Sequence, residues 1–139
     1  MAGYSKTPLT QKLGIRENSR ICFVNAPAGF ERQLVLVDVN VVSPRSKSLD
    51  FALLFVTGAA ALRGQFLALA RKLSPAGMLW VAWPKRASGI ATDLSENLVR
   101  EIGLECGLVD VKICAIDDVW SGLKFVYRLK DRPIPRTRI

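Results

Sequence analysis

Apolar residues gather in short runs along this chain, separated by stretches with helical spacing. The runs that read as strands cover residues 20–24, 39–43, 49–56 and 78–83. The runs at 49–56 and 78–83 are almost continuously apolar, which is typical of strands buried on both faces of a parallel sheet. The pattern therefore predicts a sheet with a layer of helices on each face.

Two of the intervening stretches have the spacing of amphipathic helices. The first carries a stripe of apolar residues at helical spacing: Leu62, Phe66, Leu69 and Leu73. The second covers residues 93–106, where Thr92 or Asp93 would cap the N-terminus and Glu96 would pair with Arg100 one turn later. Strands that alternate with helices predict an α/β three-layer sandwich with right-handed crossovers.

The last two apolar runs, residues 108–116 and 123–129, read as a pair of strands. The six residues between them are too few for a helical crossover, so the pair is expected to be antiparallel. Only one short strand fits between the first strand and residue 49. We therefore expect the strand order 2-1-3-4-6-5, with residues 1–130 forming a single α/β domain and residues 131–139 a basic C-terminal tail.

This arrangement is similar to the class I methyltransferase-like fold, whose sheet closes with an antiparallel last strand. Residues 49–54 look like the central strand of that fold. Residues 73–81 look like its passage from a helix through a Pro-Gly turn into a strand. The resemblance implies a reduced methyltransferase-like Rossmann sheet. In that family, S-adenosylmethionine binds at the turn after the first strand.

The turn after the first strand departs from the family's cofactor motif, an acidic residue followed by alternating glycines. The acid falls at Phe23, and the first two glycines fall at Asn25 and Pro27, so that only Gly29 matches. Proline has no amide hydrogen to offer a ligand. Each hydrogen bond lost to a charged group costs about 1.5–3 kcal/mol, so two lost contacts weaken binding on the order of 100-fold. We therefore expect no cofactor.

Nearly the whole chain, apart from the basic tail, also resembles a group of small bacterial proteins classed as a domain family of unknown function. The passages that carry this resemblance are Gly3-Tyr4-Ser5, Val24-Asn25-Ala26-Pro27, Trp80-Val81-Ala82-Trp83-Pro84-Lys85, Ser88-Gly89, Thr92-Asp93-Leu94 and Trp120-Ser121-Gly122-Leu123. The resemblance implies one full-length domain and brings no activity with it.

Composition removes several kinds of chemistry. The chain has no histidine, which excludes histidine-dependent triads, general bases and metal ligands. The three cysteines, Cys22, Cys106 and Cys114, are too widely spaced for a metal knuckle and read as small buried apolar residues. Adjacent Asp117 and Asp118 are interpreted as turn formers rather than as a catalytic pair.

The chain carries a net charge of +8, concentrated toward its two ends. Such a field attracts polyanions, so an anionic ligand or nucleic acid is one candidate partner, and a solvated basic surface is the alternative. The sequence shows neither an apolar run of membrane-spanning length nor the apolar core of a signal peptide. We expect a cytoplasmic protein with no membrane partner, and a homodimer remains open.

Ligands of open α/β sheets bind outside the carboxyl ends of the strands. The residues expected to share such a cleft are Asn25, Thr57, Trp83, Lys85, Ser88 and Trp120. In the alternative interpretation Trp83 packs under its loop, Trp120 covers the end of the sheet, and Lys85 is solvated.

Three functions remain open from these observations. The leading hypothesis is a non-catalytic binding or interaction module. The second is a divergent transferase that uses the loop 83–88. The third is an anion or nucleic-acid binder that acts through its basic termini. An open cleft at the strand ends would favour the transferase, whereas a site plugged by Phe30 and Trp120 would not.

Overall fold

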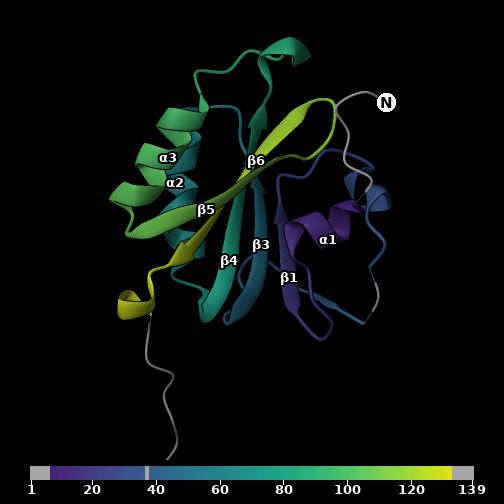
Figure 1. The fold of residues 1–139 in the computed structure, drawn as a ribbon, viewed down its shortest axis with the longest axis vertical. Coiled ribbons are helices and arrows are strands. Elements are labelled where there is room, and N and C mark those ends of the chain that lie inside the picture. Colours follow the sequence, from purple (N-terminus) through teal and green to yellow (C-terminus); the bar gives the residue numbers. More distant parts are fainter. Residues whose placement is uncertain (1–6, 37, 133–139) are drawn as a thin grey trace, which may run out of the picture.

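A six-stranded mixed sheet forms the centre of the computed structural model, which describes residues 7–36 and 38–132 (Figure 1). In spatial order the strands are β2 (Asn40–Val41), β1 (Arg20–Val24), β3 (Leu49–Phe55), β4 (Leu73–Pro84), β6 (Trp120–Tyr127) and β5 (Leu108–Ala115). The strands β2, β1, β3 and β4 are parallel, and β6 runs antiparallel to both β4 and β5. The predicted order 2-1-3-4-6-5 and its antiparallel closing hairpin are confirmed.

Helices cover both faces of this sheet. On one face lie α2 (Ala59–Ala70) and α3 (Glu96–Glu105), and on the other lie α1 (Leu9–Leu13) and the 3₁₀ turn η1 (Phe30–Gln33). Successive residues of β3 alternate between the two faces: Ala52 and Leu54 belong to the core under α2 and α3, and Leu53 to the core under α1. This alternation explains why the run at 49–56 is apolar throughout.

The apolar stripe in the sequence placed Leu73 on the same helix as Leu62, but α2 ends at Ala70 and Leu73 begins β4. Leu73 pairs with Leu49 of β3, and the Leu49 amide donates to the Lys72 carbonyl at 2.8 Å. Hydrogen bonding to a neighbouring strand therefore overrides the helical stripe at this position. A bulge follows in the ladder between β3 and β4, and β4 continues for 12 residues.

The cap of α3 also differs from expectation. Ser95 caps α3, because its hydroxyl oxygen accepts a hydrogen bond from the Leu98 amide at 3.2 Å. The carboxylate of Asp93 instead accepts from the Ala59 amide at 2.9 Å, in the first turn of α2. The predicted ion pair between Glu96 and Arg100 is confirmed at 2.6 Å.

Glycine allows α3 to approach the sheet closely. A Cβ atom added at Gly103 would lie 2.6 Å from two ring atoms of Phe125, a buried residue of β6. The Phe125 ring packs edge-on against Phe66 of α2, with ring centroids 5.1 Å apart. The side chain of residue 103 must therefore be absent for the helix to pack as it does.

Two further expectations bear on the ends of the chain and on membranes. Residues 133–139 of the predicted basic tail lie outside the described residues. Among the described residues, none of the helices combines the length and the apolar character that crossing a membrane requires.

Candidate functional site at the carboxyl edge of the sheet

The carboxyl ends of β1 and β3 border a hollow of about 260 Å³. From β1 the chain continues to β2 on one side, whereas β3 lies on the other, so this hollow lies at the topological switch point of the sheet. Three residues predicted for the site, Asn25, Thr57 and Trp120, line it. Ligands of open α/β sheets bind at this position.

Asn25 ties the strand ends together. Its backbone adopts a left-handed conformation, with φ of 60°, which asparagine tolerates better than most residues. Its side-chain amide donates to the Phe55 carbonyl at 3.1 Å and to the Gln65 side chain at 3.3 Å. The residue at the first glycine position of the cofactor motif thus links β1 to β3 and α2.

Aromatic rings pack against one another at these strand ends, on the α1 side of the sheet. Phe30 of η1 is buried, and its ring packs edge-on against Phe55 at a centroid distance of 4.9 Å. Phe55 in turn packs edge-on against Trp120 at 5.0 Å. The Phe30 amide donates to the Pro27 carbonyl at 3.0 Å, so the turn closes on itself. Phe55 was not among the predicted site residues, because an aromatic residue in a buried strand reads simply as core.

The hairpin turn between β5 and β6 places Trp120 in this cluster. One carboxylate oxygen of Asp117 accepts hydrogen bonds from the amides of Val119 and Trp120, at 2.8 and 2.9 Å. Its other oxygen accepts from the side chain of Gln33, at 3.2 Å. Asp117 therefore shapes a turn, as expected, and connects that turn to η1.

The N-terminus of α2, beside the hollow, already has an anionic partner. Asp93 accepts from the Ala59 amide there, and the Thr92 hydroxyl donates to the Thr57 carbonyl at 2.5 Å. Helix N-termini attract anions through their free amides and the helix dipole. Because the Asp93 carboxylate already occupies this position, the N-terminus of α2 attracts an anionic ligand only weakly.

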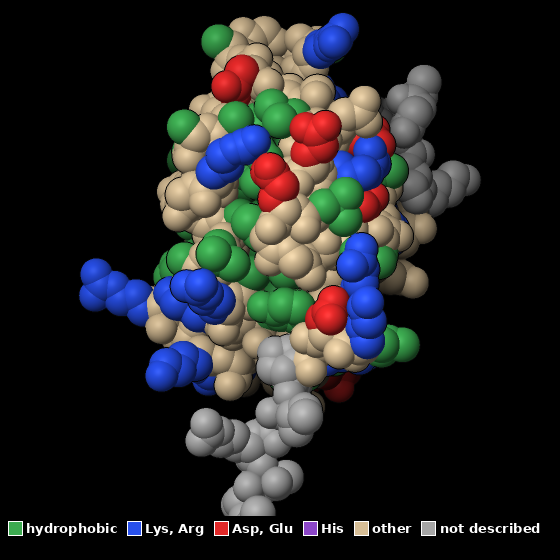
Figure 2. Space-filling model, turned by 90° about the vertical axis from the view of Figure 1, so that its left-hand side faces the viewer, with side chains coloured by type: hydrophobic (Ala, Val, Ile, Leu, Met, Phe, Trp, Pro, Cys, Tyr) green, Lys and Arg blue, Asp and Glu red, His purple; other side chains and the backbone are tan. Residues whose placement is uncertain are grey.

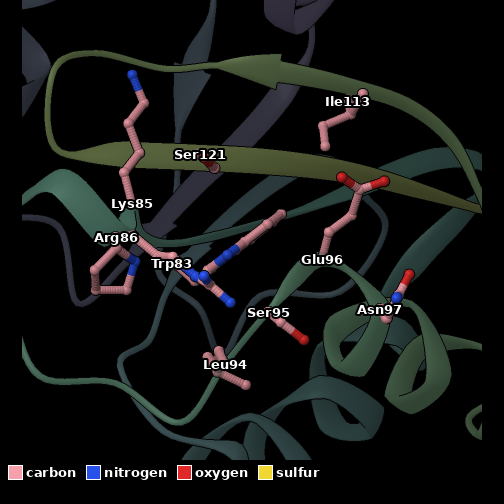
Figure 3. Close-up of a pocket in the computed structure, with 10 residues that line it drawn as sticks. Trp83, Lys85, Arg86, Leu94, Ser95, Glu96, Asn97, Ile113 and Ser121 are labelled. Carbon is pink, nitrogen blue, oxygen red and sulfur yellow. The ribbon is translucent and has the colours of Figure 1, made fainter.

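A second hollow of about 440 Å³ lies at the same edge but on the α3 side of the sheet (Figure 3). Trp83 and Lys85, from the end of β4, line it together with Arg86, and the start of α3 lies across from them. Trp83 is almost fully buried and forms part of the core under α2 and α3. Figure 3 shows that the Lys85 side chain extends away from Ser95.

Ser88 lines neither hollow among those described. Its hydroxyl donates to the Lys85 carbonyl at 2.7 Å, and its oxygen accepts from the Ile90 amide at 3.1 Å. It therefore closes the loop that follows β4. The six residues predicted for one cleft are thus divided: three border the first hollow, two border the second, and Ser88 stabilises the loop.

The cysteines provide no activated nucleophile. Burial raises the pKa of Cys22 to about 11, and burial also raises the pKa of Cys106 and of Cys114 above the ordinary value. In the described part of the chain, no group of three or more acidic or cysteine side chains is placed to hold a metal ion. The site therefore contains neither a thiolate nor a metal centre built from these residues.

We expect Cys22, which is fully buried, to react with a thiol reagent such as Ellman's reagent at least about 100-fold more slowly in the folded protein than in the unfolded chain. A pKa near 11 instead of 9.0 lowers the thiolate fraction at neutral pH by that factor, and the thiolate is the reacting species. The measurement compares labelling at neutral pH with and without guanidinium, using a variant in which Cys106 and Cys114 are serine. Equal rates in both conditions would contradict the burial of this thiol.

Comparison with known proteins identifies the architecture. Neither a family model nor a curated protein matches this chain. Among solved structures, a SAM-dependent methyltransferase from Aquifex aeolicus superimposes with a TM-score of 0.58 at 16% identity, covering 84% of this chain and 86% of that one. Magnesium protoporphyrin IX methyltransferase (ChlM) from Synechocystis PCC 6803, with bound SAH, gives a TM-score of 0.61 at 11% identity, covering 86% of this chain and 78% of that one.

The similarity extends to longer proteins. LepI in complex with SAM gives a TM-score of 0.51 at 12% identity over 88% of this chain, which spans only 47% of the LepI chain. At such identities the shared property is the arrangement of strands and helices. The chain has the class I methyltransferase-like Rossmann fold.

Proposed function

We propose that this domain is a binding module built on a methyltransferase-like sheet whose first crossover no longer admits an adenosyl cofactor. The observation that carries the proposal is the packing of Phe30, Phe55 and Trp120 over the ends of β1 and β3. These rings lie beside the switch point, where a ligand of such a sheet would bind.

The size of the hollow and its main-chain donors support the proposal. At about 260 Å³ it is smaller than the roughly 300–1,000 Å³ of sites that enclose small molecules. Pro27 has no amide hydrogen, and the Phe30 amide is bonded to the Pro27 carbonyl. Two positions of the crossover, residues 27 and 30, therefore have no free amide to offer an anionic or polar cofactor.

The larger hollow beside Trp83 is the candidate binding surface of the module. Lys85 and Arg86 border it, and no described carboxylate forms an ion pair with either. Glu96 also borders it, but its carboxylate is held by Arg100 at 2.6 Å. The positive charge at the end of β4 is therefore available to an acidic group on a partner.

We expect S-adenosylmethionine and S-adenosylhomocysteine to show no binding in the micromolar range. Titration calorimetry of the folded protein with each compound tests this expectation. The Phe30→Ala variant is titrated alongside the unaltered protein. It removes the ring that packs on Phe55 and so tests whether that ring prevents cofactor binding. Micromolar affinity of the unaltered chain for either compound would overturn the proposal.

A divergent transferase is the second candidate. The observation in its favour is the fold, since the neighbours named above are SAM-dependent methyltransferases or were solved with SAM or SAH, together with the hollow at the switch point. This candidate requires cofactor binding, so the same titration separates it from the first.

A further inference from the structure

A third hollow lies at the opposite edge of the sheet, where β3 begins, and has a volume of about 420 Å³. It is bordered by the turn between α1 and β1, the first halves of β3 and β4, the second half of β6, and the residue after the 3₁₀ turn η3 (Leu129–Asp131). Ligands of this fold class bind at the carboxyl edge. The inference below therefore does not rest on the proposed function.

Lys124 of β6 lines this hollow and has no partner among the described residues. In the ladder it is directly opposite Lys112 of β5, and like charges in that arrangement repel. The Lys112 ammonium is held in place because it donates to the Lys12 carbonyl at 2.9 Å. No described residue forms an ion pair or a side-chain hydrogen bond with the Lys124 ammonium.

The surroundings of Lys124 disfavour its charged form. Burial lowers the pKa of Lys124, and the neighbouring charges of Lys112 and Arg16 lower it further. An anion bound nearby would offset the repulsion from Lys112 and Arg16 and so favour the charged form of Lys124. A half-buried cation facing two others is therefore a position where an anionic ligand gains interaction energy.

Arg132 is a second, independent indication that the hollow binds an anion. Its Nε atom is shielded from solvent, and among the described residues it has no hydrogen-bond partner. A buried N–H group without an acceptor carries a free-energy cost that a ligand oxygen would remove. Guanidinium groups match the paired oxygens of phosphates and carboxylates.

The two carboxylates that border the hollow form no ion pair with these cations in the described part of the chain. The oxygens of Asp50 accept from the Arg20 amide at 2.9 Å and from the Ser74 hydroxyl at 2.8 Å. Glu17 is exposed, and it forms no ion pair with any described residue. The three cations, Arg16, Lys124 and Arg132, outnumber the two carboxylates by one, so the lining of the hollow is slightly basic.

Basic side chains also predominate near this end of the molecule. Figure 2 shows them toward the lower end of the face that carries α3, whereas acidic and basic side chains are interspersed further up. In Figure 1 the same lower end is where β6 leads into η3. The surrounding field would attract an anion toward this edge of the sheet.

We propose that this hollow binds a small organic oxyanion, a phosphate monoester or carboxylate with an apolar portion. The oxyanion is held by Lys124 and Arg132. The apolar portion lies against the partly exposed side chains of Met78 and Val126. The concave shape favours a small molecule over a nucleic acid, which would instead follow an extended basic surface.

Titration calorimetry and thermal unfolding test this assignment with three probes: inorganic phosphate, phenyl phosphate and uncharged phenol. We expect both phosphates to bind and to raise the unfolding temperature, phenyl phosphate more strongly, and phenol to do neither. Lys124→Met and Arg132→Gln should each weaken phenyl phosphate binding on the order of 10- to 100-fold, because each removes a charged hydrogen-bond partner.

Arg63→Met is the matched control, since it removes an exposed cation from α2, on the other face of the sheet, and should leave phosphate binding unchanged. The proposal would be overturned by no response of the unaltered protein to either phosphate, by Lys124 and Arg132 variants that bind as tightly as the unaltered protein, or by an equal loss in the Arg63 variant. Tight, Lys124-dependent binding of an oligonucleotide without binding of phenyl phosphate would overturn it in favour of a nucleic-acid surface.

Discussion

Replacing Trp80 with alanine is expected to lower the free energy of unfolding by about 3–5 kcal/mol. Trp80 lies in the middle of β4 and is fully buried in the core under α1. Its removal leaves a cavity between that helix and the sheet. It also removes the donor to the Leu13 carbonyl, which the indole Nε1 reaches at 2.9 Å. The loss is therefore one of both packing and hydrogen bonding.

Urea denaturation followed by circular dichroism measures this effect. Trp80→Phe is the companion variant, because it keeps an aromatic ring and removes the indole donor. We expect it to cost less, about 1–3 kcal/mol, as is typical when a buried acceptor loses its partner. A cost below about 1 kcal/mol for Trp80→Ala would show that the core under α1 does not depend on this side chain.

Gly103→Ala should lower the free energy of unfolding by about 1–3 kcal/mol, although alanine is the better helix former. The added methyl group would lie 2.6 Å from ring atoms of Phe125, which is itself packed between α2 and α3. To relieve this clash, either α3 must move away from the sheet or the Phe125 ring must leave its position. Overpacking is therefore expected to outweigh the gain of about 1 kcal/mol in helix propensity.

Gly64→Ala in α2 provides the matched control. A Cβ atom at Gly64 would meet no heavy atom within 4 Å, so only the change in helix propensity remains. We expect the free energy of unfolding to rise by about 0.5–1 kcal/mol. Denaturant midpoints of the two variants should thus move in opposite directions. A stabilising Gly103→Ala would mean that α3 packs less closely on the sheet than described.

Much of the fold could be predicted from the sequence because the strands of a parallel sheet are apolar throughout. The runs at 49–56 and 78–83 identified β3 and β4, and the short turn after residue 116 required the antiparallel hairpin. The errors arose where contacts distant in sequence decide the local structure. Leu73 fits a helical stripe but pairs with β3, and Asp93 fits a local cap but caps α2 instead.

The candidate site could be predicted only as far as the edge of the sheet. Topology places the ends of β1, β3 and β4 together, and the residues chosen from those ends do lie there. The face on which each side chain lies was not predicted. Trp83 packs under α2 and α3, whereas Trp120 packs on the α1 side, so one expected cleft becomes two hollows.

The segment that follows η2 (Arg86–Ser88) contacts the edges of both hollows. Thr92 and Asp93 hold the turn between β3 and α2 beside the smaller hollow. The next two residues, Leu94 and Ser95, border the larger hollow. A partner that displaces this segment while docking near Trp83 would strain the start of α2 as well. Residues 92–95 are therefore shared by the edges of both hollows, so that a substitution in this segment would alter the two together.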